Sequence, residues 1–500
     1  MNTLTPHQRK ALDYKTHISL TANAGSGKTY VLSKRYLEIA LNENLLLRNI
    51  AAITFTDKAA GELYQKIARE IEERLKAAKD KSEKEKLEQI RRQLVSANIS
   101  TIHSFCIDIL REHPVEADID ANFSPIDEIY ADELIELCVE EVIKSSFEDP
   151  AEQADLKKLI RLFSSKHIFA RELASALKHR RNILMLEKNI YDKQAGEIAK
   201  EFYEKFLSYC SSLIEERIPS FLVAAKSINQ AVIKKKSSNN KAPLIEDLLI
   251  KLSEAKSIEQ KLSLLGEIRI NMLTQKGTIA IKGYLSSEER ENLETECSAV
   301  ETFLEEITYF EIPENHSEIE LELANFGKIF IYFFNKSLNL YSEKKKQGGY
   351  LDYEDILLLT QKILENEDVR KSLSEKFKYI MIDEYQDTNE LQYRIFLPIL
   401  DYLKCGNLFV VGDEKQSIYM FRDAELEVFN KTKSEITHHA GLNSLLTLPD
   451  SFRMAPNICV FVNSLFRKLF ENPNLLFNEV EHSDIICARS DNVLGRVEIL

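Results

Sequence analysis

The chain has 500 residues, more than one hydrophobic core can organise, and its 44% hydrophobic content predicts two to four globular domains. A net charge of −14 argues against indiscriminate electrostatic binding to nucleic acid, although it leaves room for a local basic groove. The chain has no apolar run that could span a bilayer, no signal peptide and no CxxC pair among its seven cysteines. We therefore expect a cytoplasmic protein with reduced cysteines, no zinc or iron–sulfur site and no membrane partner.

A phosphate-binding loop is predicted near the N-terminus. Residues 17–21 (HISLT) fit a strand, residues 22–29 (ANAGSGKT) follow it, and residues 30–37 have a helical pattern. Strand, glycine-rich loop and helix, in this order, are typical of nucleotide-binding loops. The general pattern begins with Gly, whereas Ala22 stands first here. A small residue fits at that position if the backbone does not need a positive φ.

Four residues of this loop have side chains or backbone properties that suit the binding of phosphate and Mg²⁺. Gly25 and Gly27 let backbone N–H groups curl around phosphate oxygens. Lys28 can reach the β- and γ-phosphates, and Thr29 can offer its hydroxyl to Mg²⁺. The alternative is a turn that binds no nucleotide, but Lys28 and Thr29 would then have no packing role. We therefore predict ATP and Mg²⁺ as ligands.

A long helical segment separates this loop from the next chemical motif. Residues 51–56 (AAITFT) predict a second strand, with Phe55 near its end, and residues 61–94 are predicted to be helical. From about residue 116 to residue 346, Leu, Ile, Glu and Lys recur with helical spacing, and Gly and Pro are few. We interpret this stretch as a mostly helical insertion in the nucleotide-binding domain.

An acidic pair follows a third predicted strand. Residues 379–382 (YIMI) are short and apolar, as is typical of a buried parallel strand. The strand delivers Asp383 and Glu384 to the carboxyl edge of the sheet, where open α/β folds bind ligands. Asp383 is predicted to hold Mg²⁺, and Glu384 to polarise the attacking water. We expect the pair to share one ATP site with Lys28, although 355 positions (383 − 28) separate them.

A further strand leads into a polar loop. Residues 407–412 (NLFVVG) predict a buried strand, and residues 414–422 (EKQSIYMFR) put an amide, two aromatic rings and an arginine at the same edge. Aromatic rings at strand ends suit stacking on unpaired bases. Taken singly, Phe55, Tyr419 and Phe421 are as often core residues as DNA contacts, so both interpretations stay open.

Seven motifs in this order resemble those of the UvrD/Rep-type superfamily 1 DNA helicases, and among them the long RecB- and AddA-like members. They are residues 4–8 (LTPHQ), 22–29 (ANAGSGKT), 54–62 (TFTDKAAGE), 100–105 (STIHSF), 383–388 (DEYQDT), 411–422 (VGDEKQSIYMFR) and 448–453 (LPDSFR). In that family Ala is common at the position of Ala22, whereas Ser451 replaces a usual Asn and Asp423 replaces a frequent Gly.

The resemblance implies an ATP site with defined roles. Gln8 would read the adenine edge, Phe452 would stack on adenine, and Arg453 would act as an arginine finger on the γ-phosphate. Gln416 would couple the γ-phosphate to DNA. The implied catalytic residues are Lys28, Asp383, Glu384, Gln416 and Arg453. The implied ATP-binding residues are Gln8, Ala22, Asn23, Ala24, Gly25, Ser26, Gly27, Lys28, Thr29 and Phe452, with Thr29 and Asp383 as the metal ligands.

The resemblance also implies contacts to single-stranded DNA. The candidate residues are Thr54, Phe55, Thr56, His103, Tyr419 and Phe421. Phe421 would be the aromatic ring that stacks on a base. Taken alone, His103 would be interpreted as a structural histidine, and only its neighbours in residues 100–105 make it a DNA-contact candidate.

We therefore predict an α/β fold, a RecA-like parallel sheet with a large helical insertion and the start of a second RecA-like lobe. Residues 1–112 and 346–440 would form the ATPase lobe, and residues 113–345 the insertion. Residues 441–500 would begin the second lobe, whose remainder would follow Leu500 in a longer protein.

The predicted function is an ATP-dependent DNA helicase or translocase that moves 3′→5′ on single-stranded DNA, in recombinational repair or DNA-end processing. Its expected partners are single-stranded DNA, duplex DNA ends and a second subunit of a helicase–nuclease complex. The alternative is a module that binds ATP and DNA but cannot unwind, because the second lobe is missing. An RNA helicase or unrelated P-loop ATPase fits residues 101–105 and 416–419 less well.

Overall fold

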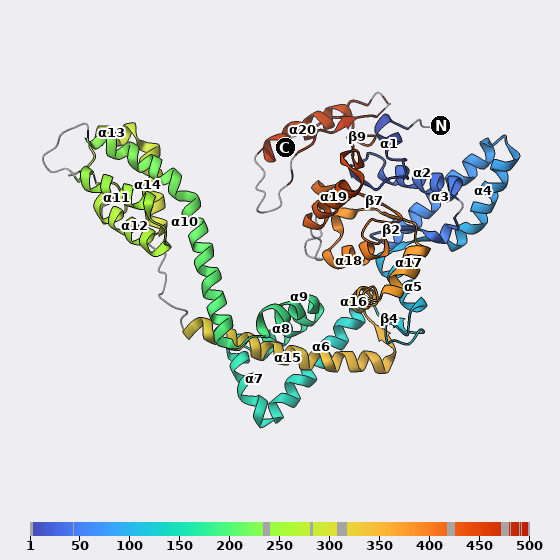
Figure 1. Cartoon of the computed structure of the whole chain (residues 1–500), viewed down its shortest axis with the longest axis horizontal. Helices are drawn as coiled ribbons and strands as arrows, with labels where there is room; N and C mark the ends of the chain where they lie inside the picture. The colour runs from blue at the N-terminus through green and yellow to red at the C-terminus, as the bar shows by residue number, and fades with distance from the viewer. Residues whose placement is uncertain are drawn as a thin grey trace. The chain divides into compact units, whose positions relative to one another are not determined.

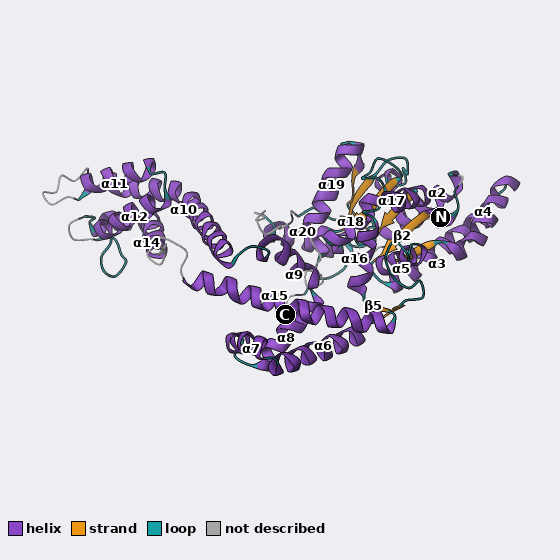
Figure 2. Cartoon of the chain, turned by 60° about the horizontal axis from the view of Figure 1, so that its bottom comes forward, coloured by secondary structure: helices purple, strands orange, loops and turns teal. Residues whose placement is uncertain are grey.

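The computed structural model describes residues 4–43, 45–233, 241–280, 284–307, 318–417, 426–471, 480, 482–489, 491 and 493–498. The chain forms two compact units (Figure 1). The first unit combines Met1–Ala131 with Glu343–Leu500, and the second is Asp132–Ser342. All named strands of the described residues belong to the first unit, whereas the second is built from helices (Figure 2).

A six-stranded parallel sheet organises the first unit, with strand order β3-β2-β6-β7-β1-β8. Its strands are β1 (Ile18–Ala22), β2 (Ile50–Thr54), β3 (Asn98–Thr101), β6 (Tyr379–Ile382), β7 (Asn407–Gly412) and β8 (Leu445–Leu448). In the register, Leu20 of β1 lies opposite Val411 of β7 and Leu446 of β8. Because the strands are all parallel, their carboxyl ends meet at one edge of the sheet.

Both faces of this sheet are buried, and successive residues of a strand pack into different cores. Ile380 and Ile382 of β6 belong to the core on one face, and Met381 belongs to the core on the other. This two-sided burial explains why β2, β6 and β7 are largely apolar runs rather than alternating apolar and polar residues. The first core includes residues of α5 (Ile102–Glu112), α16 (Tyr353–Ile363), α17 (Glu367–Lys376), α18 (Glu390–Ile399) and α19 (Leu426–Ala440), and the second includes residues of α2 (Lys28–Asn42), α3 (Asp57–Ala77) and α4 (Lys81–Gln93).

The helices of the first unit begin at predictable capping residues. Thr56 caps α3, Thr101 caps α5 and Asn389 caps α18, each by accepting a hydrogen bond from a backbone N–H of the first turn. The helices are α1 (Pro6–Lys10), α2 (Lys28–Asn42), α3 (Asp57–Ala77), α4 (Lys81–Gln93), α5 (Ile102–Glu112), α16 (Tyr353–Ile363), α17 (Glu367–Lys376), α18 (Glu390–Ile399), α19 (Leu426–Ala440) and α20 (Pro456–Leu469). The first unit also contains two short pairs of parallel strands. Strand β4 (Ser124–Pro125) pairs with β5 (Tyr350–Leu351), and β9 (Asp450–Ser451) pairs with β10 (Ile486–Cys487).

The second unit has hydrophobic cores of its own. Its elements are α7 (Pro150–Leu162), α8 (Lys166–Lys178), α9 (Arg180–Leu186), a π-helical turn (Glu187–Tyr191), α10 (Ala195–Ile233), α11 (Ala242–Glu254), α12 (Ile258–Met272), α13 (Ser287–Asn292) and α14 (Glu294–Ile307). Helices α6 (Glu128–Glu148) and α15 (Glu318–Gly348) run from one unit into the other. One core joins α6, α7, α8 and α15, and a second joins α10, α11, α12 and α14.

The predicted α/β class, the parallel sheet and the large helical insertion are confirmed. The predicted domain boundaries remain a prediction. Strand β8 lies in the range predicted to begin a second lobe, yet it pairs with β1, so the first sheet continues past residue 440 to Leu448. Within the described ranges, no helix has the length and apolar character needed to cross a bilayer.

Candidate active site

The predicted phosphate loop connects β1 to α2 at the carboxyl edge of the sheet. Gly25 and Gly27 adopt left-handed backbone conformations, with φ of +76° and +84°. A Cβ atom at Gly25 would lie 2.6 Å from Cβ of Arg453, so space as well as conformation requires glycine. Lys28 is the first residue of α2, and Thr29 follows it half-buried in the first turn.

Gln8 lies against this loop. It belongs to α1, whose capping box links Thr5 and Gln8 through reciprocal hydrogen bonds of 3.1 and 3.2 Å. The buried Gln8 side chain donates from Nε2 to the backbone oxygen of Ser26 at 3.0 Å. The N-terminal helix is therefore tied to the glycine loop through the residue predicted to recognise adenine.

The acidic pair directly follows β6. Asp383 is buried and its backbone N–H donates to the oxygen of Ile53 at 2.8 Å, which keeps it aligned with the sheet. Glu384 has a left-handed backbone, φ +52°, which is uncommon for a residue other than glycine. Its Oε2 accepts a hydrogen bond from Nζ of Lys28 at 2.5 Å. This contact joins two motifs that lie 356 positions apart in sequence.

The Asp383 carboxyl is in an environment that disfavours its charge. Burial raises its pKa to about 6, and the neighbouring Glu384 carboxylate acts in the same direction, while Lys28 opposes both. A divalent cation beside this oxygen would favour the ionised form. The environment of the Asp383 carboxyl is therefore more typical of a metal ligand than of a carboxylate without a cation beside it.

Two buried residues with no predicted role complete the acidic cluster. Gln386 donates from Nε2 to Oε2 of Glu384 at 2.9 Å and accepts at Oε1 from the backbone N–H of Asp413, also at 2.9 Å. Burial and the Glu384 carboxylate raise the pKa of Asp387 to about 6. The sequence signal for both was their place in the run 383–388, beside the acidic pair.

Gln416 is brought close to this cluster through Asp413. Asp413 is the residue after β7, and its Oδ2 accepts from Nε2 of Gln416 at 2.7 Å. Lys415 pairs with the other carboxylate oxygen at 3.0 Å. Because β7 lies between β6 and β1 in the sheet, this turn ends between the acidic pair and the phosphate loop.

The segment after β8 contacts the phosphate loop from the other side. Ser451 donates from Oγ to the oxygen of Ala24 at 3.0 Å, and the N–H of Phe452 donates to the oxygen of Gly25 at 2.9 Å. The side chains of Phe452 and Arg453 are exposed, with 43% of Phe452 accessible. The two residues predicted to contact adenine and the γ-phosphate are therefore beside the loop, on the side opposite to β7.

The loop and acidic pair fit a nucleotide and a magnesium ion. In the described part of the chain, buried Oδ1 of Asn23 and Oγ of Ser26 have no hydrogen-bond partner, which is costly unless a ligand or water satisfies them. The described residues contain no group of three or more His, Cys, Asp or Glu arranged to hold a metal. Magnesium often needs only one or two protein ligands, because it keeps waters and binds substrate phosphates.

The four described candidate DNA-contact residues lie at the carboxyl ends of β2 and β3 or directly after them, at the same edge of the sheet. Thr54 is buried and its Oγ1 donates to the oxygen of Thr56, so this hydroxyl already has a structural bond. Phe55 is half-buried and Thr56 caps α3. Burial lowers the pKa of His103 to about 4, so its ring, 4.8 Å from that of Tyr353, is neutral at pH 7. Tyr419 and Phe421 lie outside the described residues.

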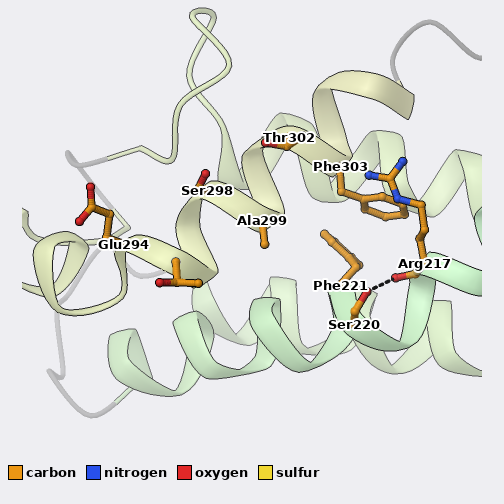
Figure 3. Close-up of a pocket in the computed structure, with 9 residues that line it drawn as sticks. Arg217, Ser220, Phe221, Glu294, Ser298, Ala299, Thr302 and Phe303 are labelled. Carbon is orange, nitrogen blue, oxygen red and sulfur yellow. Dashed lines mark hydrogen bonds between the residues drawn. The ribbon is translucent and has the colours of Figure 1, made fainter. Parts of the chain in front are cut away.

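A separate hollow of ≈ 640 Å³ lies between α10 and α14 in the second unit (Figure 3). Phe221 and Phe303 pack against one another there, with ring centroids 4.8 Å apart, and the guanidinium of Arg217 lies 5.1 Å from the Phe303 ring. Arg217 also pairs with Glu306, so its charge is already compensated. We assign no ligand to this hollow.

A parallel sheet with a glycine loop, a lysine and an acidic pair at its carboxyl edge defines an α/β fold of the P-loop class. Within that class, the chain belongs to the family described as UvrD/REP helicase N-terminal domain, which matches residues 4–437.

Relatives similar to the chain over nearly its whole length are bacterial helicase–nuclease subunits by name. Exonuclease/helicase subunit RexA of Lactococcus lactis subsp. cremoris (strain MG1363) is 29% identical, over 94% of this chain and 40% of the relative. An ATP-dependent helicase/nuclease subunit from Listeria welshimeri is 31% identical over the same shares. A relative of the same name from Syntrophomonas wolfei is 30% identical, over 93% and 38%. The chain thus spans about 40% of the length of the relatives that it matches.

Proposed function

We propose that this chain is the ATP-binding part of an ATP-dependent DNA helicase or translocase. The observation that carries the proposal is the 2.5 Å contact between Nζ of Lys28 and Oε2 of Glu384, which brings the phosphate loop and the acidic pair to one place. An ATP site needs both, because phosphoryl transfer depends on binding the phosphates, neutralising their charge and positioning the nucleophile.

The proposed roles follow from the chemistry of the side chains. Lys28 and the loop N–H groups bind the phosphates, and Thr29 and Asp383 hold Mg²⁺. When bound, the metal neutralises charge on the phosphate oxygens. Glu384 orients the attacking water and accepts its proton, since its carboxylate contacts Lys28 of the loop and its side chain is 37% exposed to solvent.

The remaining ATP roles belong to three residues around the loop. Gln8 recognises adenine, Phe452 stacks on it, and Arg453 contacts the γ-phosphate. Two structural contacts support this assignment, from Gln8 to Ser26 and from Phe452 to Gly25. Gln416 transmits the state of the γ-phosphate toward DNA, with support from its bond to Asp413.

On the nucleic-acid side, we propose that single-stranded DNA lies over the ends of β2 and β3. Thr54, Phe55, Thr56 and His103 are placed there, and Tyr419 and Phe421 would add stacking from the loop after β7. Movement 3′→5′, recombinational repair and DNA-end processing rest on the family resemblance. A second subunit of a helicase–nuclease complex is the proposed protein partner, since the relatives are named as subunits. The ATPase lobe at residues 1–112 and 346–440, the insertion at residues 113–345 and the start of a second lobe within residues 441–500 complete the proposed domain arrangement.

The test is DNA-stimulated ATP hydrolysis by the full-length gene product. Lys28→Ala and Glu384→Gln should each lower turnover by about 100-fold or more, because each removes a group that acts on the transferred phosphate or on water. Lys404→Ala and Glu365→Gln make the same chemical changes at exposed positions and should leave turnover unchanged. Wild-type turnover in either site variant would contradict the proposal, and stronger stimulation by RNA than by single-stranded DNA would reassign the substrate.

The second candidate function is a module that binds ATP and DNA without unwinding. It is favoured by one observation, that the described ATP-site residues all belong to the first unit. Strand displacement on a duplex with a 3′ single-stranded tail separates the two. The helicase predicts ATP-dependent displacement by wild type that Lys28→Ala abolishes, whereas the module predicts DNA binding without displacement.

A further inference from the structure

Gln386 lies between the ends of two strands and uses both ends of its amide. It is 3% exposed and belongs to the 3₁₀ turn Tyr385–Asp387 that follows the acidic pair. Nε2 donates to Oε2 of Glu384, and Oε1 accepts from the N–H of Asp413, each at 2.9 Å. A buried amide that is satisfied at both ends has one favourable orientation, so it fixes the distance between its two partners.

These bonds belong to a longer chain of contacts. Lys28 binds Glu384 at 2.5 Å, and Asp413 accepts from Gln416 at 2.7 Å. Gln386 is therefore the central member of a continuous path from the phosphate loop, through the acidic pair, to the loop after β7. Each contact of the path joins a hydrogen-bond donor to an acceptor at 2.5–2.9 Å.

Gly412, the last residue of β7, leaves space for the side-chain amide of Gln386. A Cβ atom at Gly412 would lie 2.5 Å from Oε1 and 3.0 Å from the backbone nitrogen of Gln386. The strand can approach the turn this closely only because it ends in glycine. The amide is thus packed directly against the backbone of β7 as well as bonded to it.

We propose that Gln386 is a positioning residue for ATP hydrolysis, which holds the Glu384 carboxylate in place and couples it to the loop that carries Gln416. The proposal rests on the proposed function, since Glu384 has to be the group that acts on water. A phosphate that takes Lys28 as its partner leaves Glu384 to the Gln386 amide. A neutral donor orients a carboxylate while lowering its basicity less than a lysine does.

Two substitutions separate positioning from packing. Gln386→Met keeps the length of the side chain and removes both bonds. We expect kcat of DNA-stimulated ATP hydrolysis to fall about 10- to 100-fold, as is typical for a misplaced reacting group. KM for ATP and the affinity for a fluorescent ADP analogue should stay within about threefold, because Gln386 does not belong to the phosphate loop.

Gln386→Glu gives a readout that packing alone would not produce. When ionised, the new carboxylate cannot donate to Glu384, and it also faces the carboxylate of Asp387, whose Oδ2 lies 3.4 Å from Nε2 of Gln386 in the wild-type protein. When protonated, it can donate an O–H to Glu384 and still accept from the Asp413 N–H. The kcat ratio of variant to wild type should therefore rise as the pH falls from 8.5 to 6.

The controls make the outcomes distinguishable. Gln89→Met removes an exposed amide from α4 and should change neither kcat nor the unfolding midpoint. Suppose that the wild-type protein hydrolyses ATP. An unchanged kcat in Gln386→Met, or a pH-independent kcat ratio of Gln386→Glu to wild type, would then overturn the inference and leave the proposed function standing. If Gln386→Met does not fold, the pH-dependent ratio decides alone. A wild-type protein that does not hydrolyse ATP would overturn both.

Discussion

Gly25 lies where the phosphate loop contacts the segment that carries Arg453. Its φ of +76° costs a residue with a Cβ atom about 1–2 kcal/mol, and the added atom would meet Cβ of Arg453 at 2.6 Å. We expect Gly25→Ala to weaken binding of a fluorescent ATP analogue at least about tenfold, because Arg453 and the loop have to move apart. A titration of the analogue against the variant measures this.

Gly441 provides the matched control. It has a similar φ of +79°, but a Cβ atom there would meet nothing within 4 Å. Gly441→Ala should therefore lower the thermal unfolding midpoint through its backbone conformation alone, while nucleotide affinity stays that of wild type. Equal losses of affinity in the two variants would show that backbone strain alone is responsible.

At the residue scale, the sequence predicts those groups whose chemistry needs a fixed residue at a fixed spacing. The glycine loop with Lys28 and the acidic pair are of this kind, and the structure brings Lys28 and Glu384 into contact. Gln386 and Ser451 are of another kind, because they bond to Asp413 N–H and Ala24 oxygen, backbone groups that every residue type offers. No sequence pattern reveals which distant backbone atom a polar side chain will reach.

At the scale of elements, a buried arginine connects three segments of the first unit. Arg35 on α2 is 0% exposed and donates to the oxygens of Ala11 at 2.8 Å and Asp13 at 2.6 Å, before β1. It also donates to Oδ1 of Asn407 at 2.9 Å, at the start of β7. Burial lowers the pKa of Arg35 to about 9, which leaves it charged at pH 7.

Replacing this guanidinium should destabilise the first unit. Arg35→Met leaves two buried acceptors and the part-buried oxygen of Asp13 without their donor, which we expect to cost about 2–5 kcal/mol and to lower the unfolding midpoint by roughly 5–15 °C. Differential scanning calorimetry measures the change. Arg9→Met, on the exposed side of α1, should shift the midpoint by less than about 1 °C. A small effect in both variants would mean that water replaces the guanidinium.

The sequence predicts which segments form strands better than it predicts which strands lie next to one another in the sheet. The apolar run at residues 379–382, the buried run at residues 407–412 and the residues before the glycine loop, 17–21, each predict a strand, and all three predictions are confirmed. The sequence does not predict the pairing of β8 with β1, because the prediction from sequence places residues 441–500 in another lobe. A parallel pair carries no local turn signal, because its strands are joined through distant connections.

At the scale of the whole molecule, the two units have separate hydrophobic cores. The chain leaves and re-enters the first unit at neighbouring points, since β4 pairs with β5 and the rings of Tyr130 and Tyr350 lie 5.6 Å apart. A short linker can therefore join Ala131 to Glu343. This arrangement makes the second unit removable in principle without opening the sheet.

We expect a variant lacking residues 132–342, joined by a Gly/Ser linker, to bind a fluorescent ADP analogue with an affinity within about threefold of the full chain, because the described ATP-site residues stay in one unit. Titration of the analogue measures it. Lys28→Ala in the same shortened chain should abolish the signal and is the control. Loss of binding in the shortened chain would show that the sheet depends on the second unit for its fold.

The place of β1 between β7 and β8 has a consequence during protein synthesis. Its neighbours in the sheet both come from residues after position 406, so Ile18–Ala22 leaves the ribosome long before either can pair with it. The last residue of β7 follows that of β1 by 390 positions (412 − 22), which takes about 20–80 s at 5–20 residues per second. Throughout this interval an apolar strand has no native neighbour, a condition that favours aggregation and makes nascent chains of this protein candidates for chaperone binding.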